Sequence, residues 1–522
     1  MTDSAASQNE VLAFLGDART HGGRSVRRID THAAIVFLAG ARALKVKRAV
    51  RFPFLDYSTL DKRHAACQAE LEVNRHFAPE LYRRVVPITR APDGRLMLDG
   101  EGEPVEWAVD MRRFDETQTL DRLAEDGRLD EALADRLARA VAAMHARAPA
   151  ADFEAWLGKI GEILGQNAVA FRELPKLFPA KDVESLVAAT RAAFDRVRPL
   201  LEARGHTGLV RRGHGDLHLG NIALIDGRPL PFDAIEFDPL IAAGDLLYDL
   251  AFLLMDLVER RLSGFANLVL NRYLLETGRP EDLPGLAALP LFMSLRASIR
   301  AKVTAARIEH VSKAQRAKRA QTAKVYFGLA ARLLSPAEPM LVAIGGLSGT
   351  GKSALARALA PFLMPEPGAV VVRSDVERKI LFGADEMQRL PPEAYHADVN
   401  AKVYERISDK AGRTLAARHS AVADAVYGRG SERAAIEAVA TRADVPFCGL
   451  FLVADLDVRL QRIGGRAGDA SDADAAVARQ QEQWSLDEIE WKRIDASGTQ
   501  EETLAKARAA LARRQDKTRD GG

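Results

Sequence analysis

The sequence predicts two unlike domains: an α+β domain with a small β-rich lobe and a large helical lobe, followed by an α/β domain with a parallel sheet. At 522 residues the chain is too long for one hydrophobic core, and its 47% hydrophobic and 28% charged residues are typical of globular proteins. Strand patterns come first and helical patterns follow, as in an α+β domain. Beyond residue 337 the strand patterns MLVAIGG, AVVVRSD, SAVADAVY and FCGLFLVAD alternate with helical segments, which indicates βαβ units around a parallel sheet.

The small lobe begins with strand patterns. Residues 31–50 read as two strand-forming runs separated by a glycine turn. Ser58 is expected to open a helix, because Ser58 and Asp61 resemble a capping pair. Further strand patterns cover residues 85–100 and 105–114.

The large lobe is expected to be mostly helical. Apolar residues recur at helical spacing over residues 129–334, and one island of loop and strand at about 213–249 interrupts them. Residues 335–339 contain two prolines and read as a linker, because proline cannot continue a helix. The predicted parts are residues 1–336 with a small lobe at about 1–115, residues 337–515, and a disordered tail at 516–522.

A phosphate-loop motif opens the second domain. Residues 346–353 match G-x-x-x-x-G-K-[ST] in full, behind an apolar strand and ahead of a helix. Glycines let backbone N–H groups turn toward phosphate oxygens, and the helix N-terminus adds partial positive charge. Lys352 is expected to act as a catalytic cation on the β- and γ-phosphates of ATP, and the Ser353 hydroxyl to hold Mg²⁺. The residues predicted to bind the nucleotide are Gly346, Gly349, Thr350, Gly351, Lys352 and Ser353.

Two carboxylates follow at predicted strand ends, where ligands bind in open α/β sheets. Asp375 ends the run AVVVRSD, and Arg378 lies three residues later. Asp375 is expected to act as the base that takes a proton from an acceptor hydroxyl, and Arg378 to bind an anionic or polar part of that substrate. Asp424 ends the run SAVAD and is expected to bind the hydration shell of Mg²⁺. The alternative for each aspartate is a structural role, which for Asp375 is capping the next helix.

Arginines of a candidate lid complete the second site. Arg459, Arg462 and Arg466 precede the polar run GDASDAD. Mobile lids often place arginines over a transferring phosphoryl group, where negative charge develops. Arg462 and Arg466 are predicted to bind the nucleotide in this way, and the alternative is a solvated helix face.

Residues 340–513 resemble the small P-loop kinases, such as gluconate kinase, polynucleotide kinase and chloramphenicol phosphotransferase. The resemblance depends on GGLSGTGKS and on the D-x-x-R spacing of Asp375 and Arg378. In the polynucleotide-kinase group the aspartate acts as base and the arginine holds the substrate, so the resemblance implies these roles here.

A second motif lies in the strand-and-loop island of the first domain. The run HGDLHLGN, residues 214–221, is followed after a short strand by Asp233. Asp216 and Asn221, five residues apart and with a later aspartate, have the spacing of a kinase catalytic loop. Asp216 is expected to orient the acceptor hydroxyl and accept its proton, while Asn221 and Asp233 hold Mg²⁺ ions.

A kinase also needs a cation on the α- and β-phosphates of ATP and an acid to position that cation. Lys45 and Lys47 lie on the predicted strand ALKVK, and with a period of two they face the same side. Lys45 is preferred, because Lys47 has further basic neighbours. Glu70, in the middle of the helix expected after Ser58, is the predicted partner, with Glu72 as the alternative.

Residues 1–334 resemble the aminoglycoside phosphotransferase and choline kinase group, which shares the protein-kinase fold. The signature consists of HGDLHLGN, FDAIEFD and the acidic run GDLLYDLAFLLMD. The whole chain resembles the bifunctional aminoglycoside phosphotransferase/ATP-binding protein family. The sequence departs from the protein-kinase pattern in two ways. It has no clear G-x-G-x-x-G loop, and the lack of this loop is usual in the aminoglycoside phosphotransferase and choline kinase group. Ala-Ile-Glu instead of Phe-Gly follows Asp233.

The acidic run allows two interpretations. Asp245, Asp249 and Asp256 line a pocket for a cationic acceptor, or Asp245 and Asp249 stabilise the loop. Resemblance to antibiotic kinases does not imply antibiotic substrates, because one fold hosts many functions.

Composition limits the partners. A formal charge of +2 gives no electrostatic argument for nucleic acid or an anionic membrane, and the basic residues Arg296, Arg300 and Lys302 are interpreted as parts of solvated helix faces. Cys67 and Cys448 match no metal-ligand spacing and indicate a reducing compartment. The sequence shows no signal peptide and no membrane-length apolar run, so a cytoplasmic protein with small-molecule partners is expected.

The favoured interpretation is an ATP- and Mg²⁺-dependent enzyme with two kinase-type sites, each transferring the γ-phosphoryl group to a hydroxyl of a small metabolite. In a second interpretation only the first domain is a kinase, and the P-loop domain is an ATP-driven regulatory module. In a third, the P-loop domain is a nucleic-acid 5′-hydroxyl kinase, which the near-neutral charge argues against.

Overall fold

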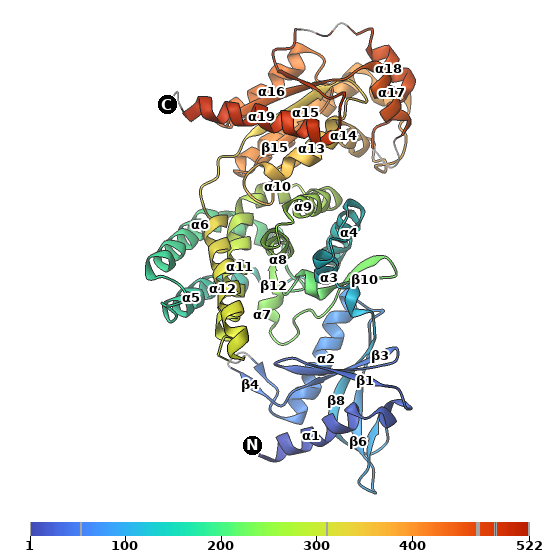
Figure 1. Cartoon of the computed structure of the whole chain (residues 1–522), viewed down its shortest axis with the longest axis vertical. Coiled ribbons are helices and arrows are strands. Elements are labelled where there is room, and N and C mark those ends of the chain that lie inside the picture. Colours follow the sequence, from blue (N-terminus) through green and yellow to red (C-terminus); the bar gives the residue numbers. More distant parts are fainter. Residues whose placement is uncertain are drawn as a thin grey trace. The chain divides into compact units, whose positions relative to one another are not determined.

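The computed structural model describes residues 2–52, 55–309, 312–465, 470–484, 486 and 488–519. The chain divides into two compact units (Figure 1). Unit 1 comprises residues 1–169 and 199–256, and unit 2 comprises residues 170–198 and 257–522. Unit 2 therefore contains the P-loop region together with helices from the middle of the chain.

A six-stranded antiparallel sheet forms the β-rich part of unit 1, in the order β1-β2-β3-β8-β6-β7. Its strands are β1 (Val26–Asp30), β2 (Ala34–Ala39), β3 (Arg42–Lys47), β6 (Tyr82–Arg90), β7 (Leu96–Leu98) and β8 (Glu103–Arg112). Gly40, with φ +57°, makes the predicted turn between β2 and β3. Helix α2 (Leu60–Phe77) contributes Cys67 and Leu71 to the buried cluster that covers one face of the sheet.

Helix α2 begins later than the sequence predicts. Its N-cap is Thr59, whose hydroxyl accepts a hydrogen bond of 3.3 Å from the Lys62 N–H. The Ser58 hydroxyl instead donates to Asp56 over 2.6 Å. The predicted Ser58–Asp61 capping pair is therefore wrong, because the nearby Asp56 carboxylate takes the Ser58 hydroxyl.

The rest of unit 1 is mainly helical, and three helices, α5, α6 and α8, continue into unit 2. The helices are α1 (Thr2–Gly16), α3 (Leu120–Glu125), α4 (Glu131–Arg147), α5 (Phe153–Arg172), α6 (Ala180–His206), α7 (Pro239–Ala242) and α8 (Leu246–Glu259). Short two-stranded ladders join β4 (Arg51–Phe52) to β5 (Leu55–Asp56), β9 (Val210–Arg212) to β12 (Ala243–Asp245), and β10 (Ile222–Ile225) to β11 (Arg228–Pro231).

Unit 2 contains a five-stranded, wholly parallel sheet in the order β14-β15-β13-β16-β17. Its strands are β13 (Leu341–Gly346), β14 (Val370–Arg373), β15 (Ala421–Asp424), β16 (Phe447–Val453) and β17 (Lys492–Asp495). The first four agree with the strand patterns of the sequence, and the α/β prediction is confirmed. Strand β17 was not predicted, because it is short and has only one buried residue, Ile494.

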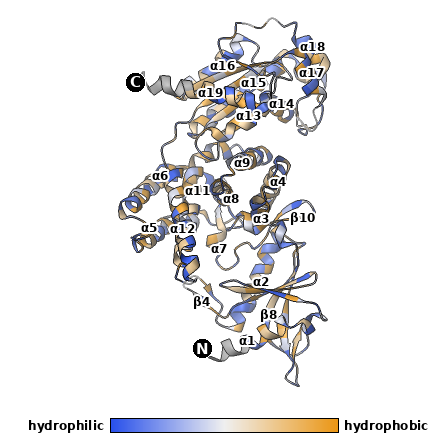
Figure 2. Cartoon of the chain, viewed as in Figure 1, coloured by the Kyte–Doolittle hydropathy of each residue, from blue (hydrophilic) through white to orange (hydrophobic). Residues whose placement is uncertain are grey.

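The other described elements of unit 2 are mainly helices. They are α9 (Ser263–Thr277), α10 (Asp282–Gly285), α11 (Leu289–Ala306), α12 (Lys313–Leu333), α13 (Lys352–Leu359), α14 (Ser374–Leu381), α15 (Ala397–Ala416), α16 (Gly430–Arg442), α17 (Leu456–Gly464), α18 (Ala475–Gln481) and α19 (Gln500–Arg519). Figure 2 shows hydrophobic and hydrophilic residues along the same helices, as expected where one face is buried. Helix α19 includes the first four residues of the segment predicted as a tail.

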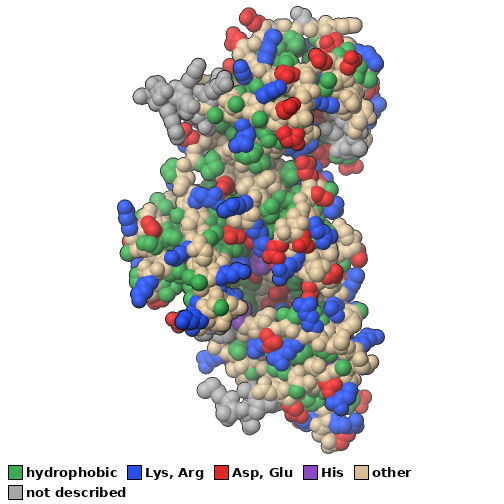
Figure 3. Space-filling model, in the orientation of Figure 1, with side chains coloured by type: hydrophobic (Ala, Val, Ile, Leu, Met, Phe, Trp, Pro, Cys, Tyr) green, Lys and Arg blue, Asp and Glu red, His purple; other side chains and the backbone are tan. Residues whose placement is uncertain are grey.

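Short 3-10 turns complete the described secondary structure. They lie at Ala18–His21, Glu116–Gln118, Leu219–Asn221, Leu286–Ala288, Ala360–Phe362 and Pro392–Tyr395. Within the described ranges, no helix combines the length and the apolar character needed to cross a bilayer. On the face drawn in Figure 3, Lys and Arg side chains are interspersed with Asp and Glu.

Candidate functional site

Unit 1 brings the two predicted lysines to one acid. Lys45 and Lys47 belong to β3, and Glu70 belongs to α2. The Lys45 Nζ lies 2.7 Å from Glu70 Oε1, and the Lys47 Nζ lies 2.6 Å from Glu70 Oε2. Glu70 is fully buried, whereas Glu72 is exposed. The structure thus places Glu70, and not Glu72, beside the lysines, and Glu70 contacts both of them.

Each lysine also contacts a second carboxylate. Lys45 lies 2.5 Å from Asp233, whereas Lys47 contacts Glu236. Burial by itself would lower the pKa of Lys45, but Asp233 and Glu70 outweigh burial and raise this pKa well above its ordinary value. Burial by itself would raise the pKa of Glu70, and the two lysines lower it instead. Lys45 and Glu70 therefore each favour the charged form of the other, and Lys45 is the lysine beside the predicted metal ligand Asp233.

The predicted catalytic loop runs from β9 to β10, and its key side chains contact each other. The Asn221 Nδ2 donates to the backbone carbonyl of Asp216 over 3.1 Å and to its carboxylate over 3.0 Å. The Asp216 side chain is 37% exposed, so an acceptor molecule can reach it. The Phe232 N–H donates to the Asn221 carbonyl over 2.9 Å, which places Asp233 next to the end of the loop.

Asp233 is held by residues that the sequence analysis did not identify. Its φ of +60° is uncommon for a residue other than glycine, and its N–H donates to the Tyr82 hydroxyl over 3.0 Å. The following residue, Ala234, exchanges hydrogen bonds of 2.8 and 3.3 Å with the buried side chain of Asn74. Asn74 lies one turn after Glu70 on α2. Helix α2 therefore positions both the lysine pair and the predicted metal-binding loop.

The acidic run holds the catalytic loop by its backbone. Asp249 accepts hydrogen bonds from the N–H groups of His214 and Gly215 over 2.9 and 2.8 Å. Asp256 accepts one from the Leu219 N–H over 3.0 Å. Both aspartates are buried, so their carboxylates act inside the lobe.

Asp245 has a comparable internal role. Its carboxylate pairs with the buried guanidinium of Arg204 over 2.6 and 2.9 Å and accepts from the Leu247 N–H over 2.8 Å. These contacts favour loop stabilisation over a cationic-acceptor pocket as the role of the acidic run.

The donor set of the loop fits a magnesium ion. Mg²⁺ prefers oxygen ligands and is usually held by one or two protein groups together with substrate phosphates. Asn221 and Asp233 supply an amide oxygen and a carboxylate. In the described ranges, no group of three or more His, Cys, Asp or Glu is arranged to hold a metal alone. One amide oxygen and one carboxylate are the kind of donor set that holds a metal together with substrate phosphates.

In unit 2, three glycines give the phosphate loop its shape. Gly346, Gly349 and Gly351 have φ values of +139°, +86° and +93°, which side chains other than glycine rarely adopt. A Cβ atom at Gly346 would lie 2.7 Å from the Leu452 carbonyl oxygen, and one at Gly349 would lie 2.8 Å from that of Arg459. Conformation favours glycine at all three positions, and close packing requires it at Gly346 and Gly349.

The residues after the loop join it to the neighbouring strand. Lys352 begins α13, and its Nζ donates to the Leu347 carbonyl over 3.2 Å. The Ser353 hydroxyl donates to Asp424 over 2.5 Å, and Arg373 lies 3.5 Å from the same carboxylate. Burial raises the pKa of Asp424, although Lys352 and Arg373 oppose this effect. The two predicted magnesium ligands, Ser353 and Asp424, are therefore in direct contact.

Two of the lid arginines contact the phosphate-loop backbone. The Arg462 Nη1 donates to the Thr350 carbonyl over 3.4 Å. The Arg459 Nε donates to the Ser348 carbonyl over 2.8 Å, and Arg459 is almost completely buried. Arg459 thus fixes the loop, a role that the sequence analysis missed. Arg466 lies outside the described residues.

A buried glutamine of α18 also contacts the loop. Gln481, the last residue of α18, accepts a 2.7 Å hydrogen bond from the Ser348 N–H and is buried. No motif marked this residue in the sequence. A phosphate oxygen that used the same N–H would have to replace the Gln481 oxygen.

The acceptor side of unit 2 contains Asp375 and Arg378 on α14. Asp375 lies in the first turn of the helix, whose N-cap is Arg373, so Asp375 is not the capping residue. The buried Arg378 donates to the Ala394 carbonyl over 2.6 Å, and its guanidinium lies 4.8 Å from the Tyr395 ring centre. Among the described residues the Arg378 Nε has no hydrogen-bond partner. Burial lowers the pKa of Arg378, against the effect of Asp375.

Asp472 connects the lid to this acceptor side. It accepts hydrogen bonds from the Lys379 Nζ over 2.7 Å, the Tyr395 hydroxyl over 2.5 Å and the Leu390 N–H over 3.0 Å. The sequence analysis had treated this part of GDASDAD only as a polar run. Its three partners show a fixed position for the lid carboxylate.

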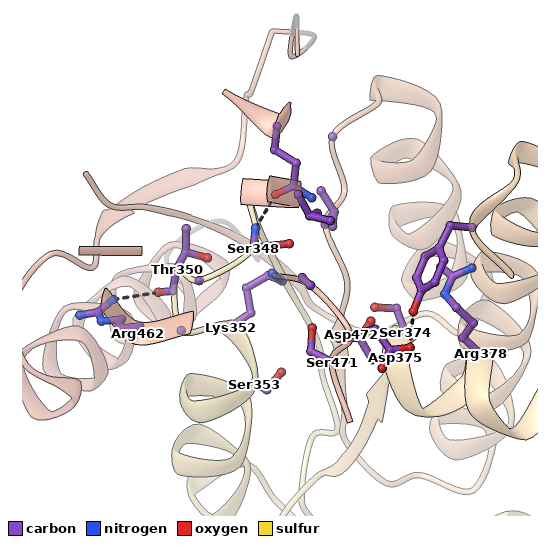
Figure 4. Close-up of a pocket in the computed structure, with 18 of the residues that line it drawn as sticks. Ser348, Thr350, Lys352, Ser353, Ser374, Asp375, Arg378, Arg462, Ser471 and Asp472 are labelled. Carbon is purple, nitrogen blue, oxygen red and sulfur yellow. Dashed lines mark hydrogen bonds between the residues drawn. The ribbon is translucent and has the colours of Figure 1, made fainter. Parts of the chain in front are cut away.

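One cavity of about 1470 Å³ joins the nucleotide side to the acceptor side. Figure 4 shows Lys352 and Ser353 on one side of it and Asp375 and Arg378 on the other, with Asp472 on the segment between them. Ligand pockets typically measure about 300–1,000 Å³. The cavity is therefore large enough for a nucleotide and a small second substrate together.

Two family models match the chain. Residues 40–289 match the model described as "Phosphotransferase enzyme family", and residues 341–485 match the model described as "AAA domain". The first match covers the lysine pair and the catalytic loop, and the second covers the phosphate loop, Asp375 and Asp424.

Solved structures similar to each part include two kinases. A gluconokinase from Sinorhizobium meliloti is 20% identical and aligns with 36% of this chain and 100% of its own, with a TM-score of 0.27. A choline/ethanolamine kinase family protein from Mesorhizobium loti is 13% identical and aligns with 63% of this chain and 99% of its own, with a TM-score of 0.37.

Relatives similar over nearly the whole length occur in mycobacteria. A protein of Mycobacterium tuberculosis and one of Mycobacterium bovis, both described as uncharacterized, are each 30% identical over 490 residues. These alignments cover 92% of this chain and 94% of each relative. The chain therefore belongs to the family of these mycobacterial proteins, and it combines an N-terminal region that matches the phosphotransferase family model with a C-terminal region that matches the AAA-domain model and carries the phosphate-loop motif.

Proposed function

We propose that the protein is an ATP-dependent enzyme with two phosphotransferase sites, one in each unit. Each site would transfer the γ-phosphoryl group of ATP to a hydroxyl group of a small molecule. The observation that carries the proposal is the unit 2 cavity, which has Lys352 and Ser353 on one side and Asp375 and Arg378 on the other. The kinase-type domains of both units support phosphotransfer as the common reaction.

In unit 1, Asp216 would accept the proton of the acceptor hydroxyl. Its carboxylate is partly exposed, and the hydrogen bond from Asn221 fixes its orientation. Lys45 would contact the ATP phosphates while Glu70 holds its ammonium group in place. Catalysis of this kind depends on positioning and charge stabilisation, because the enzyme forms no covalent intermediate.

In unit 2, the backbone of the phosphate loop and Lys352 would bind the ATP phosphates, and Asp375 would take the acceptor proton. Arg378 lines the acceptor side of the cavity, and its guanidinium suits an acceptor with an anionic or strongly polar group. Mg²⁺, held by Asn221 and Asp233 in unit 1 and by Ser353 and Asp424 in unit 2, would neutralise phosphate charge.

A screen for phosphorylated products tests this proposal. The full-length protein, ATP and Mg²⁺ are incubated with pools of sugars, polyols, nucleosides and aminoglycosides, and products are identified by mass spectrometry. Asp216→Ala is expected to remove the unit 1 product and Lys352→Ala the unit 2 product, each by about 10³-fold, the scale of losing a main transition-state contact. Lys324→Ala, at an exposed position of α12, is the matched control and is expected to change neither.

Other outcomes would identify a different function for unit 2. If no acceptor accelerates ATP turnover by the Asp216→Ala variant, a regulatory ATPase module is the better account. If that variant phosphorylates oligonucleotide 5′ ends with a steep salt dependence, unit 2 is a nucleic-acid kinase.

A further inference from the structure

The outer edge of β14 has backbone groups that no strand pairs with. In the described part of the sheet, β14 pairs with β15 alone and forms one edge. The Val370 N–H donates to the Ser420 carbonyl over 3.0 Å, toward β15. Because backbone groups alternate in direction along a strand, those of Ala369 and Val371 face the outer edge. Open edges of this kind are usually covered in folded proteins.

Two asparagines of α9 bind these edge groups. The Asn271 Nδ2 donates to the Ala369 carbonyl over 3.1 Å, and its Oδ1 accepts from the Val371 N–H over 2.7 Å. The Asn267 Nδ2 donates to the same Ala369 carbonyl over 3.0 Å. Asn267 and Asn271 are four residues apart, so they lie on one face of the helix. Helix α9 therefore supplies side-chain amides where another strand would supply backbone groups.

The packing around Asn267 leaves no room for a side chain at Gly368, the residue before Ala369. Gly368 has φ +119°, and a Cβ atom there would lie 2.8 Å from the Asn267 Nδ2 and 2.5 Å from the Ala360 carbonyl oxygen. Asn267 itself is 98% buried. The contact is therefore a closely packed part of unit 2.

Helix α9 also contacts the chain beyond α14. The Arg272 Nη1 lies 2.6 Å from the Glu386 carboxylate, and both side chains are mostly buried. Glu386 lies in the segment that leads to Arg389 and Leu390, which line the cavity. The helix that carries Asp375 and Arg378 is thus tied to α9 on both sides, through β14 before it and through Glu386 after it.

We propose that Asn267, Asn271 and Arg272 are positioning residues for the acceptor half of the unit 2 site. Strand β14 ends two residues before Asp375, so a shift of this strand moves the proposed base directly. The phosphate loop extends instead from β13, the middle strand of the sheet. Helix α9 lies within residues 40–289, so a helix of the phosphotransferase match supports the acceptor side of the unit 2 cavity from outside.

Hydrogen exchange on the full-length protein tests the contact without any acceptor. Asn271→Leu keeps the approximate size of the side chain and removes its hydrogen bonds to Ala369 and Val371, together with those to Asn267. Exchange in a peptide covering residues 370–381 is expected to accelerate about tenfold or more, because two hydrogen bonds to the strand edge are lost. The peptide covering 341–346 and the affinity for a non-hydrolysable ATP analogue are expected to stay unchanged. Gly264→Ala, on the same helix with open space around its Cβ, is the control.

A second variant separates the two edge contacts. Asn267→Leu removes one donor to the Ala369 carbonyl and leaves the hydrogen bond between Asn271 and the Val371 N–H, so a smaller acceleration is expected. Unchanged exchange over 370–381 in both variants would overturn the inference. A loss of affinity for the ATP analogue as large as the acceleration of exchange would also overturn it, because that result would indicate general destabilisation of unit 2.

The kinetic part of the inference rests on the proposed function. With a unit 2 acceptor, in the Asp216→Ala background, Asn271→Leu is expected to lower kcat/KM for the acceptor about tenfold, with little change in KM for ATP. An unchanged kcat/KM would refute the positioning role. Since hydrogen exchange needs no acceptor, failure of the proposed function and failure of the α9 contact give different results.

Discussion

Glu70 shows how far single residues can be interpreted from the sequence. Strand alternation predicted that Lys45 and Lys47 face one side, and the structure shows both of them on the two oxygens of Glu70. Their further partners differ, because Lys45 contacts Asp233 and Lys47 contacts Glu236. These second contacts assign the two lysines different expected roles, which the strand pattern alone did not separate.

Replacing each lysine in turn tests this difference. Lys45→Met is expected to lower unit 1 turnover by about 10²–10³-fold, because it removes the cation next to the phosphates. Lys47→Met leaves Glu236 without its buried lysine. This variant is expected to lower the thermal midpoint clearly and to lower turnover less than Lys45→Met does. Turnover and thermal midpoints are measured in the Lys352→Ala background. A greater loss of turnover in Lys47→Met, at an unchanged midpoint, would reverse the assignment.

The site residues missed by the sequence analysis share one property. Asn74, Tyr82, Gln481 and Asp472 are single polar residues whose partners lie far away in the chain, such as Ala234 for Asn74 and Ser348 for Gln481. Motifs such as residues 346–353 were recognisable because their function depends on local spacing. Contacts between distant segments depend on packing, which no local pattern contains.

At the scale of elements, strong periodic patterns gave the correct structure and marginal ones did not. The four apolar strands of unit 2 were predicted, whereas β17 has a single buried residue and resembles a loop in sequence. The start of α2 was misplaced, because Ser58 binds Asp56 and Thr59 caps the helix. Caps depend on competition among neighbouring polar residues, and sequence alone does not resolve that competition.

A buried imidazole joins two elements of the unit 2 sheet and gives a prediction about pH. His419, just before β15, is fully buried, and its Nε2 lies 2.9 Å from the Gly368 carbonyl oxygen ahead of β14. Burial lowers the pKa of His419 to about 4. In the unfolded chain a histidine pKa is about 6.5, so the unfolded state binds the proton first as the pH falls.

The contribution of neutral His419 to the free energy of unfolding is fully present above about pH 6.5. It is lost as the pH falls toward the pKa of His419 in the folded protein. Between pH 7 and pH 5 the loss from this group is about 2 kcal/mol in the free energy of unfolding. His419→Gln is expected to remove this part of the pH dependence. The free energy of unfolding of unit 2 is measured by chemical denaturation of the full-length protein at pH 7 and at pH 5. An identical pH dependence in the variant would show that His419 does not titrate as described.

At the scale of the whole molecule, the pattern of secondary structure in the sequence and the packing in the structure divide the chain at different places. The rhythm changes at residues 335–339, where two prolines separate helices from βαβ units. Compact packing instead groups residues 170–198 and 257–522, because α9 and α10 pack on elements of the P-loop region. The contacts of Asn267, Asn271 and Arg272 show one physical basis for this grouping.

The similarity of this chain to its relatives extends over both matched regions. The mycobacterial relatives align over 92% of this chain, through both family matches. We propose that each of the two domains has its own nucleotide pocket. That claim is central, because the expected roles of Asp216, Asn221, Lys352 and Asp375 all depend on it.

Counting bound nucleotides tests the claim most directly. Native mass spectrometry of the full-length protein, with Mg²⁺ and a non-hydrolysable ATP analogue, is expected to show two analogues per chain. Lys45→Ala and Lys352→Ala are each expected to retain one, and the double variant none. One analogue per unmodified chain, or the loss of both in either single variant, would contradict two separate phosphotransferase sites.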